Sequence, residues 1–256
     1  MEDAPRRGDL PANVERVERT LASLPKSDLV VFPELFLSGY RVGDRLARLA
    51  LHPGSPELRG LSSAAESHGG WVVVGTPWRL SERPGEVLNV ALALGPKGER
   101  GVQGKRYLPN FGPFEEGIHL SPVGRSDPLS LLGGSIGWQI CYDTFFPEVS
   151  RDLALGGAQA IGVLSASPVT SRALFEKLLP ARAIENGLPV AFCNRTGVED
   201  GMVFAGGSGL WDVRGERVPP VEERTTGETR WLSYTLDLEE AARWRPFRPV
   251  LRDLST

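Results

Sequence analysis

The chain has 256 residues, of which 41% are hydrophobic and 24% charged, and its formal net charge is −3. This composition is typical of a globular protein. The basic residues form no long run, which argues against a nucleic-acid-binding surface. No apolar stretch is long enough to cross a bilayer, and "MEDAPRRGDL" lacks the apolar region of a signal peptide.

The few cysteines and histidines argue against a disulfide-stabilised protein and against a zinc protein. Cys141 and Cys193 make no disulfide framework, so we expect a reducing, cytoplasmic environment. The three histidines, His52, His68 and His119, form no close pair and accompany no C-x-x-C, so the sequence predicts no metal site.

Predicted strands and helices alternate along the chain. Short apolar runs bounded by Gly, Pro or Asp predict strands, and apolar residues at helical spacing between caps and glycines predict helices. Residues 96–100, between two of the strands, predict a hairpin turn. In chain order we expect a helix over 10–25, a strand over 28–34, a helix over 55–70, strands over 70–77, 87–95, 101–108 and 135–141, a helix over 145–157, a strand over 158–168, a helix over 171–187, and strands over 188–195 and 230–237.

These elements predict a single α/β domain over residues 1–256, with helices outside a two-sheet core. Most strand runs lack clean alternation, as expected when both faces of a strand are covered. Ser55 is expected to cap the second helix, and Pro180 to kink or split the fourth. Residues 238–256 show no clear period and are expected to form a loosely ordered tail.

Cys141 stands out because it lies where a predicted strand ends and a helix begins. A lone cysteine is usually a small core residue. A sharp turn after a strand, however, can expose a nucleophile beside backbone N–H groups, and the positive end of the next helix would favour the thiolate. Asp143 and Glu148 fit acids of a first helical turn. No histidine obviously supplies a base.

Three further segments carry candidate charges. Glu34 ends an apolar strand, where burial would raise its pKa and let it accept a proton. Lys105 also ends a strand and would stabilise an oxyanion if it lay beside a thiolate. Taken singly, these two residues, like Glu115 and Glu116, fit solvated surface charges.

Together, these segments resemble the nitrilase, or carbon–nitrogen hydrolase, superfamily and its amidase-type branch. "DLVVFPELFLSGY" is similar to the general-base segment, "KRYLPNFGPFEE" to the lysine segment and "GWQICYDTFFPEVSRDLALGGA" to the nucleophile segment. "ARAIEN" at 181–186, "NRTG" at 194–197 and "FAGGS" at 204–208 also match, so the resemblance covers about residues 8–237. It implies a four-layer α-β-β-α sandwich.

The resemblance also implies a mechanism. Glu34 matches the base, Cys141 the nucleophile, Lys105 the catalytic lysine and Glu116 the supporting glutamate, with Glu115 in its place if the register shifts by one. The thiolate would attack an amide carbonyl, Lys105 and the Tyr142 N–H would hold the oxyanion, and water would release the acid from a thioester. No metal or organic cofactor is required.

The substrate stays open at this level. "ICYD" resembles amidases, and we expect a small linear amide, with an N-carbamoyl amine as the alternative. "KRYLPNFGPFEE" and "SASP" at 165–168 also resemble the glutaminase part of NAD synthetases. The residues expected around the substrate are Tyr40, Phe111, Tyr142, Phe145 and Ser165 with the residues up to Pro168.

Three rival interpretations were weighed. "GGSIG" fits an esterase motif at Ser135, but every histidine precedes that serine. The glycines at 206–209 lack the full spacing of a dinucleotide-binding loop and a following helix. A catalytically silent binding subunit of the same fold is disfavoured because Glu34, Lys105 and Cys141 are all present.

The resemblance implies two further expectations. One is a homodimer, or higher homo-oligomer, that pairs through the helices at 145–156 and 173–186. The other concerns the amino end, because members of the superfamily usually open with an apolar strand. Residues 1–5, with two acids and a proline, are expected to be unable to form a buried strand without unpaired polar groups, so we expect the true start to lie upstream of Met1.

Overall fold

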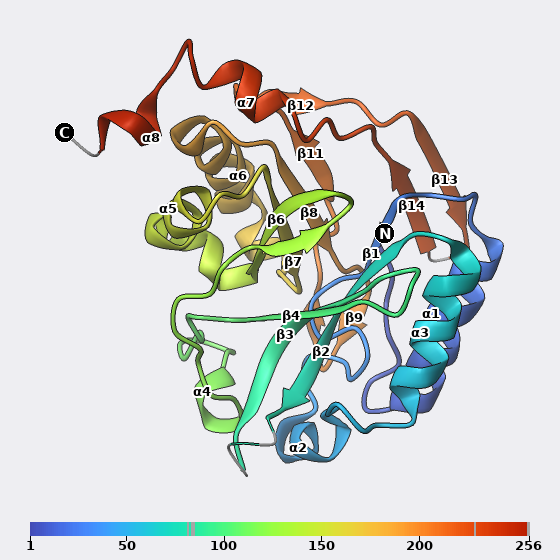
Figure 1. The fold of residues 1–256 in the computed structure, drawn as a ribbon. Coiled ribbons are helices and arrows are strands. Elements are labelled where there is room, and N and C mark those ends of the chain that lie inside the picture. Colours follow the sequence, from blue (N-terminus) through green and yellow to red (C-terminus); the bar gives the residue numbers. More distant parts are fainter. Residues whose placement is uncertain (81, 83–84, 228, 255–256) are drawn as a thin grey trace.

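Two β-sheets form from the apolar runs of the sequence (Figure 1). The computed structural model describes residues 1–80, 82, 85–227 and 229–254. The first sheet has the strand order β1-β2-β3-β4, with β1 parallel to β2 and the other pairs antiparallel. Its strands are β1 (Leu29–Val31), β2 (Trp71–Arg79), β3 (Val87–Leu94) and β4 (Arg100–Gly104). The predicted hairpin is confirmed, because β3 and β4 pair in the register Leu94↔Arg100.

The second sheet has the order β12-β11-β8-β7-β6-β5. Its central strands β6, β7 and β8 are parallel, so their carboxyl ends meet at one edge. Its strands are β5 (Leu129–Leu131), β6 (Gly134–Ile140), β7 (Ala160–Ser165), β8 (Val190–Asn194), β11 (Gly209–Trp211) and β12 (Arg217–Val218). Two small antiparallel pairs accompany it, β9 (Val198–Glu199) with β10 (Met202–Val203), and β13 (Glu222–Thr226) with β14 (Thr229–Ser233).

Helices cover the outer face of each sheet (Figure 1). α1 (Leu10–Ser23) and α3 (Glu57–His68) pack on the first sheet, and α5 (Pro147–Leu155) and α6 (Arg172–Asn186) pack on the second. Shorter elements complete the chain: η1 (Gly43–Arg45), α2 (Leu46–Leu49), α4 (Glu116–His119), η2 (Cys141–Phe145), η3 (Val169–Ser171), α7 (Glu240–Trp244) and α8 (Val250–Asp253).

Three apolar layers hold these elements together. Val17 of α1 packs with Leu61 of α3 and Val72 of β2 on one side, and Phe175 of α6 packs with Val163 of β7 on the other. Between the sheets, Val73 and Ala91 of the first sheet meet residues such as Ile136 and Trp138 of the second. The order helix, sheet, sheet, helix confirms the expected four-layer α-β-β-α sandwich in one domain.

Local expectations were wrong in three places. α6 runs from Arg172 to Asn186 with Pro180 inside it, so Pro180 does not split the helix. Phe175, Leu179 and Ala183 hold the helix by packing into the core. Ser55 does not cap α3, since its hydroxyl accepts a hydrogen bond from the His52 N–H instead. The tail from 238 contains α7 and α8 in its described part, up to residue 254, and Ala241 is buried.

The amino-terminal residues include two buried acids that have polar partners. Residues 1–5 lie in no named strand, yet Glu2 and Asp3 are buried and paired. Glu2 Oε1 accepts a 2.6 Å hydrogen bond from the Ser208 N–H, and Asp3 forms an ion pair with Arg16. These residues form no named strand, as expected, and both buried acids have partners.

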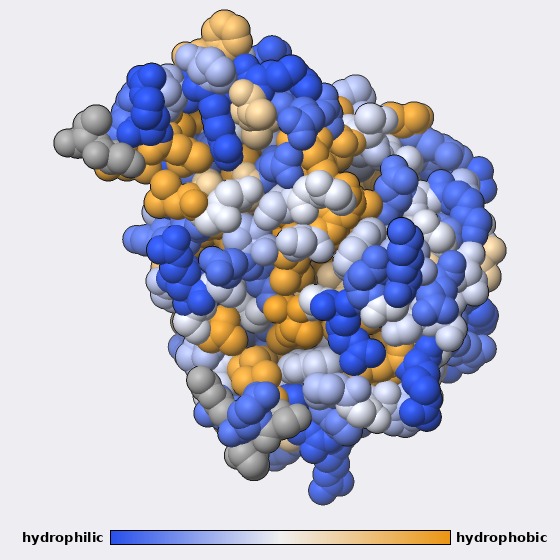
Figure 2. All heavy atoms as spheres, viewed as in Figure 1, coloured by the Kyte–Doolittle hydropathy of each residue, from blue (hydrophilic) through white to orange (hydrophobic). Residues whose placement is uncertain are grey.

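Much of the face drawn in Figure 2 is polar. Figure 2 shows hydrophobic side chains gathered in a band down the middle of one face, flanked by hydrophilic ones. Across the described ranges of the chain, no helix combines the length and the apolar character that a membrane span requires.

Candidate active site

Residues just beyond three strands supply the chemistry. Glu34 follows β1, Lys105 follows β4 and Cys141 follows β6. Leu35, next to Glu34, and Cys141 itself have positive φ angles of 47° and 49°, so the backbone turns sharply at both places. Gly75 of β2 allows the first turn, because a Cβ there would lie 2.3 Å from the carbonyl oxygen of Pro33.

Lys105 lies between two carboxylates in the protein interior. Its Nζ donates hydrogen bonds of 2.7 Å to Glu34 Oε1 and 2.7 Å to Glu116 Oε1, and its side chain is fully buried. Burial by itself would lower the pKa of Lys105, but the charges of Glu116 and Glu34 outweigh it and raise the pKa. Lys105 is therefore a fixed cation at neutral pH.

Glu116 binds Lys105 from the first turn of α4. Its Oε1 also accepts a 2.5 Å hydrogen bond from the Tyr40 hydroxyl. Burial raises the pKa of Glu116 to about 7, and the charge of Lys105 opposes this rise. Glu115 is exposed, so the structure brings Glu116 and not Glu115 to Lys105.

Both carboxylate oxygens of Glu34 accept hydrogen bonds. Besides Lys105, Oε1 accepts a 2.8 Å bond from Asn89 Nδ2, and Oε2 accepts a 2.8 Å bond from the Ala166 N–H. Asn89 lies on β3, and its carbonyl also accepts the Lys105 N–H at 2.8 Å. The sequence analysis missed Asn89, although an asparagine inside the apolar run "VLNVALAL" was a visible signal.

Cys141 is held as a neutral thiol. Burial and the nearby charge of Glu34 raise its pKa, and the charge of Lys105 opposes this effect. The expectation that a helix end would favour the thiolate is wrong, because the segment after Cys141 is the short 3-10 turn η2 and α5 starts only at Pro147. A thiol with a raised pKa needs a base to remove its proton. The charge of Glu34 is close enough to affect the pKa of this thiol, so Glu34 is the candidate base.

Asp143 links the Cys141 turn to the Lys105 segment. Its Oδ1 accepts hydrogen bonds from the N–H groups of Arg106 (3.1 Å) and Tyr107 (2.9 Å), and its Oδ2 accepts one from Ile140 (3.1 Å). Burial raises the pKa of Asp143 to about 6, against the lowering effect of Lys105 and these N–H groups. Asp143 lies in the first turn of η2 and Glu148 in the first turn of α5, as expected, but Asp143 is also buried and joins two segments of the site.

Aromatic side chains surround the site. Phe111 packs on Tyr142 with ring centroids 5.4 Å apart, and Tyr142 packs on Phe145 at the same distance. Tyr40 contacts Phe114 and so joins the same group of rings. Phe145 also packs on Phe175 of the core, so this ring connects the site to the core.

Ser165 ends β7 and is buried. Its side chain interacts with the Cys141 thiol and opposes the rise in the pKa of that thiol. Within the described ranges the buried Glu116 Oε2 has no hydrogen-bond partner. Ser135, the serine of the esterase motif, lies inside β6 and pairs with Ser130 of β5, not at an exposed turn.

Three polar residues that the sequence analysis did not single out position the loops around the site. Arg182 Nε donates to the Thr144 carbonyl at 2.9 Å, behind the Cys141 turn. Glu199, paired with Arg195, accepts the Arg41 N–H at 2.6 Å and thereby holds the loop that carries Tyr40. Arg182 and Arg195 lie in "ARAIEN" and "NRTG", which were noted only as matches.

Metal ligands are not grouped in this part of the fold. Among the residues that the structure describes, no three His, Cys, Asp or Glu side chains are placed to hold a metal ion.

Comparison with known proteins agrees with this geometry. The family model for carbon–nitrogen hydrolases matches residues 4–246, slightly beyond the expected 8–237 at both ends. A CN-hydrolase superfamily protein from Xanthomonas campestris, solved with an arsenic adduct in its active site, is 26% identical with a TM-score of 0.84 and covers 98% of this chain and 94% of that one.

Two further relatives bear on the chemistry. A mutant amidase from Nesterenkonia sp. AN1, which shows covalent addition of the acetamide moiety of fluoroacetamide at its active-site cysteine, is 30% identical with a TM-score of 0.73, and 85% of this chain and 82% of that chain are covered. The glutamine-dependent NAD(+) synthetase of Thermotoga maritima is 31% identical over 98% of this chain, which spans 44% of that protein.

Proposed function

Because this chain belongs to the carbon–nitrogen hydrolase family, we propose that it hydrolyses the C–N bond of a small linear amide to ammonia and a carboxylic acid. The observation that carries the proposal is the buried Lys105, which is hydrogen bonded to Glu34 and Glu116 next to the Cys141 turn. An ammonium between two carboxylates is a costly arrangement in a protein interior, and such groups are typical of reactive sites.

In the proposed first step, Glu34 accepts the thiol proton of Cys141 as the sulfur attacks the amide carbon. The Lys105 ammonium and the Tyr142 N–H stabilise the charge that develops on the carbonyl oxygen. The raised pKa of Cys141 supports this order, since the thiol keeps its proton until the base removes it.

In the second step, the proton passes from Glu34 to the leaving nitrogen, ammonia departs and Cys141 carries a thioester. Glu34 then removes a proton from water, which attacks the thioester carbon and releases the acid and the thiol. Each step uses side chains of this chain and water, so the proposed mechanism needs no cofactor.

Glu116 has a different proposed role. It holds Lys105 and Tyr40, and its Oε2 is available to the substrate nitrogen. Ser165 lies beside the Cys141 thiol, and Phe111 and Tyr142 border the site. The aromatic rings around the site are the reason for proposing a small, unbranched acyl group.

Two other substrate classes compete within this mechanism. An N-carbamoyl amine presents the same carbonyl–nitrogen bond, and glutamine is a small linear ω-amide that the similarity to the Thermotoga maritima synthetase suggests. Ammonia release should be measured from aliphatic amides, glutamine, N-carbamoyl amines and nitriles, with Cys141→Ala as the blank. We expect the wild type to release ammonia from amides and Cys141→Ala to release none. Release from none of these substrates would favour a catalytically silent binding subunit and contradict the proposal.

We also propose that the chain forms a homodimer through the helices behind the nucleophile. Leu155 of α5 and Leu174 and Ile184 of α6 are 50%, 47% and 43% exposed, although they are apolar. Apolar residues grouped on neighbouring helices are typical of a protein–protein interface. The reducing environment expected from Cys141 and Cys193 stays a prediction; both are free thiols in the structure.

A further inference from the structure

A buried ion pair lies behind the loop that carries Tyr40. Arg195 directly follows β8, Glu199 lies on β9, and their side chains are 1% and 3% exposed. Removing two charges from water is unfavourable, and the attraction between them offsets this only when the geometry is good. Neither residue takes part in the proposed mechanism, so the buried pair needs another reason.

Glu199 binds the backbone of this loop with both of its carboxylate oxygens. Oε2 accepts a 3.3 Å hydrogen bond from the Tyr40 N–H, and Oε1 accepts a 2.6 Å bond from the Arg41 N–H. Arg195 Nη1 donates to the same Oε2 and so fixes the orientation of the carboxylate. Gly39 permits the close approach, because its φ is 79° and a Cβ there would lie 3.2 Å from Glu199 Oε1. The direction in which the Tyr40 side chain leaves the backbone is thereby fixed.

The ring of Tyr40 is held as well. Phe114 and Phe204 each meet it edge to face, with ring centroids 6.3 Å and 6.2 Å away. The guanidinium carbon of Arg195 lies 4.0 Å from the centroid of the Phe204 ring, in a cation–π contact. Arg195 therefore supports Tyr40 in two ways, through Glu199 and through Phe204.

The Tyr40 hydroxyl connects this arrangement to the proposed chemistry. It donates a 2.5 Å hydrogen bond to Glu116 Oε1, the oxygen that also accepts the Lys105 ammonium. Burial raises the pKa of Glu116, and both Lys105 and the hydrogen bond from Tyr40 oppose this rise. The titratable groups that act on Glu116 are Lys105, Glu34, Tyr40 and Cys141.

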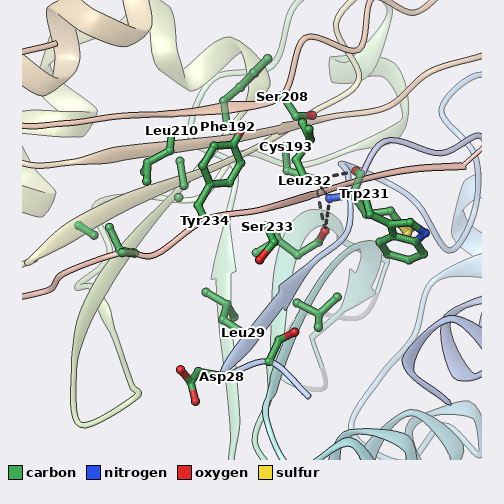
Figure 3. Close-up of a pocket in the computed structure, with 18 of the residues that line it drawn as sticks. Asp28, Leu29, Phe192, Cys193, Ser208, Leu210, Trp231, Leu232, Ser233 and Tyr234 are labelled. Carbon is green, nitrogen blue, oxygen red and sulfur yellow. Dashed lines mark hydrogen bonds between the residues drawn. The ribbon is translucent and has the colours of Figure 1, made fainter. Parts of the chain in front are cut away.

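The strand β8 also borders a cavity, which is separate from the ion pair. The cavity has a volume of about 850 Å³ and lies between β1 and β14, and Leu29 and Cys193 are among the residues that line it (Figure 3). Arg195, two residues beyond Cys193, does not line this cavity, and neither do Glu199 and Tyr40. The contacts of the ion pair therefore lead to the active site and not to the cavity.

Building on the proposed function, we infer that the Arg195–Glu199 pair is a positioning device for Tyr40. The pair keeps the Tyr40 hydroxyl on Glu116, and Glu116 in turn keeps the Lys105 ammonium directed at the substrate carbonyl. Arg195 and Glu199 touch no reacting atom in this scheme, so they are positioning residues. Without Glu199 the loop is free to shift, and the hydrogen bond from Tyr40 to Glu116 weakens.

The sign of the effect on Glu116 separates positioning from simple electrostatics. Loss of the hydrogen bond from Tyr40 should raise the pKa of Glu116, because that bond favours the carboxylate. Loss of the negative charge of Glu199 should by itself lower the pKa of Glu116, because a like charge is removed. A rise after substitution of Glu199 therefore reports the position of Tyr40 and not the missing charge.

The Glu116 carboxyl can be titrated directly, without turnover, by carbon-13 NMR of protein with labelled glutamate, and Glu116→Gln assigns its signal. Tyr40→Phe should raise the titration midpoint by about one pH unit, as expected for a lost hydrogen bond to a charged group. Glu199→Gln should raise it in the same direction. Tyr40→Phe combined with Glu199→Gln should raise it no further than Tyr40→Phe alone, because both act through one hydroxyl.

Two further variants control for folding and for charge. Glu199→Gln leaves Arg195 buried without its partner, which strongly destabilises a protein. Arg195→Met with Glu199→Gln removes both charges and should also raise the midpoint. Asp200→Asn is the matched control, since Asp200 is the next acid in the chain and forms its ion pairs with the side chains of Arg7 and Arg41. It should leave the midpoint unchanged.

Amide hydrolysis by the same variants gives the second readout. The kcat/KM should fall about tenfold in Tyr40→Phe and in Glu199→Gln, and no further when the two are combined. An unchanged or lowered midpoint in folded Glu199→Gln, or a rise that adds to that of Tyr40→Phe, would overturn the inference. A wild type that releases no ammonia from any amide would contradict the proposed function, while the NMR titration would still decide whether the pair positions Tyr40.

Discussion

Asn89 on β3 donates a 2.8 Å hydrogen bond to Glu34, and both side chains are fully buried. The Asn89 carbonyl also accepts the Lys105 N–H, so one residue touches the proposed base and the backbone of the proposed oxyanion-binding lysine. We therefore regard Asn89 as a positioning residue.

Asn89→Leu should lower kcat/KM about 10- to 100-fold, because a buried hydrogen bond to a charged group is lost while the volume is nearly kept. Asn89→Asp should be worse, since it places a carboxyl group against Glu34 and removes the donor. Steady-state kinetics with thermal unfolding as the folding control check this. If Asn89→Leu folds and retains full activity, Asn89 has no positioning role.

Cys141→Ala should reduce amide hydrolysis by at least about a thousandfold, because no thioester can form. Cys193→Ala is the matched control, since Cys193 is buried on β8 and lies outside the proposed mechanism. Its kcat should stay within about twofold. Intact mass spectrometry of the wild type during turnover should show one acyl adduct, and an adduct on Cys193 would contradict the mechanism.

Glu116→Gln should lower activity about 10- to 100-fold by weakening the hold on Lys105. Glu115→Gln, one residue earlier and exposed, should change it less than about twofold. A larger loss in Glu115→Gln than in Glu116→Gln would show that Glu115 supports the lysine.

The pH profile provides a separate check on Glu116. Its folded-state pKa of about 7 lies above the usual value of 4.5, so Glu116 gains a proton as the pH falls through about 7 and its negative charge beside Lys105 is lost. The kcat/KM of the wild type should therefore decline below about pH 7, and Glu116→Gln should lose this acid limb. An unchanged limb in the variant would assign it to another group.

Leu155→Glu with Ile184→Glu should convert the proposed dimer into monomers, because a charge on each helix would be buried against the partner. Val221→Glu is the control, since Val221 is 73% exposed and lies away from α5 and α6. Light scattering at micromolar concentration measures the outcome. A monomeric wild type would contradict the dimer.

The sequence by itself determined the order of strands and helices and the positions that carry the chemistry. Apolar runs such as 87–95 and 158–168 became β3 and β7 because local pattern and burial agree there. The residues at strand ends, Glu34, Lys105 and Cys141, were visible for the same reason, since a polar residue that closes an apolar run is a local signal.

Tertiary structure decided everything that depends on contacts between distant residues. Asp143 connects two segments of the site because the segment after Lys105 brings the N–H groups of Arg106 and Tyr107 to its carboxylate. The pKa of Cys141 is raised because burial and the charge of Glu34 outweigh the charge of Lys105. Glu2 is buried only because Ser208 and Arg230 meet it from the other end of the chain. Desolvation and Coulomb interactions act through space, so residues adjacent in the sequence could not reveal them.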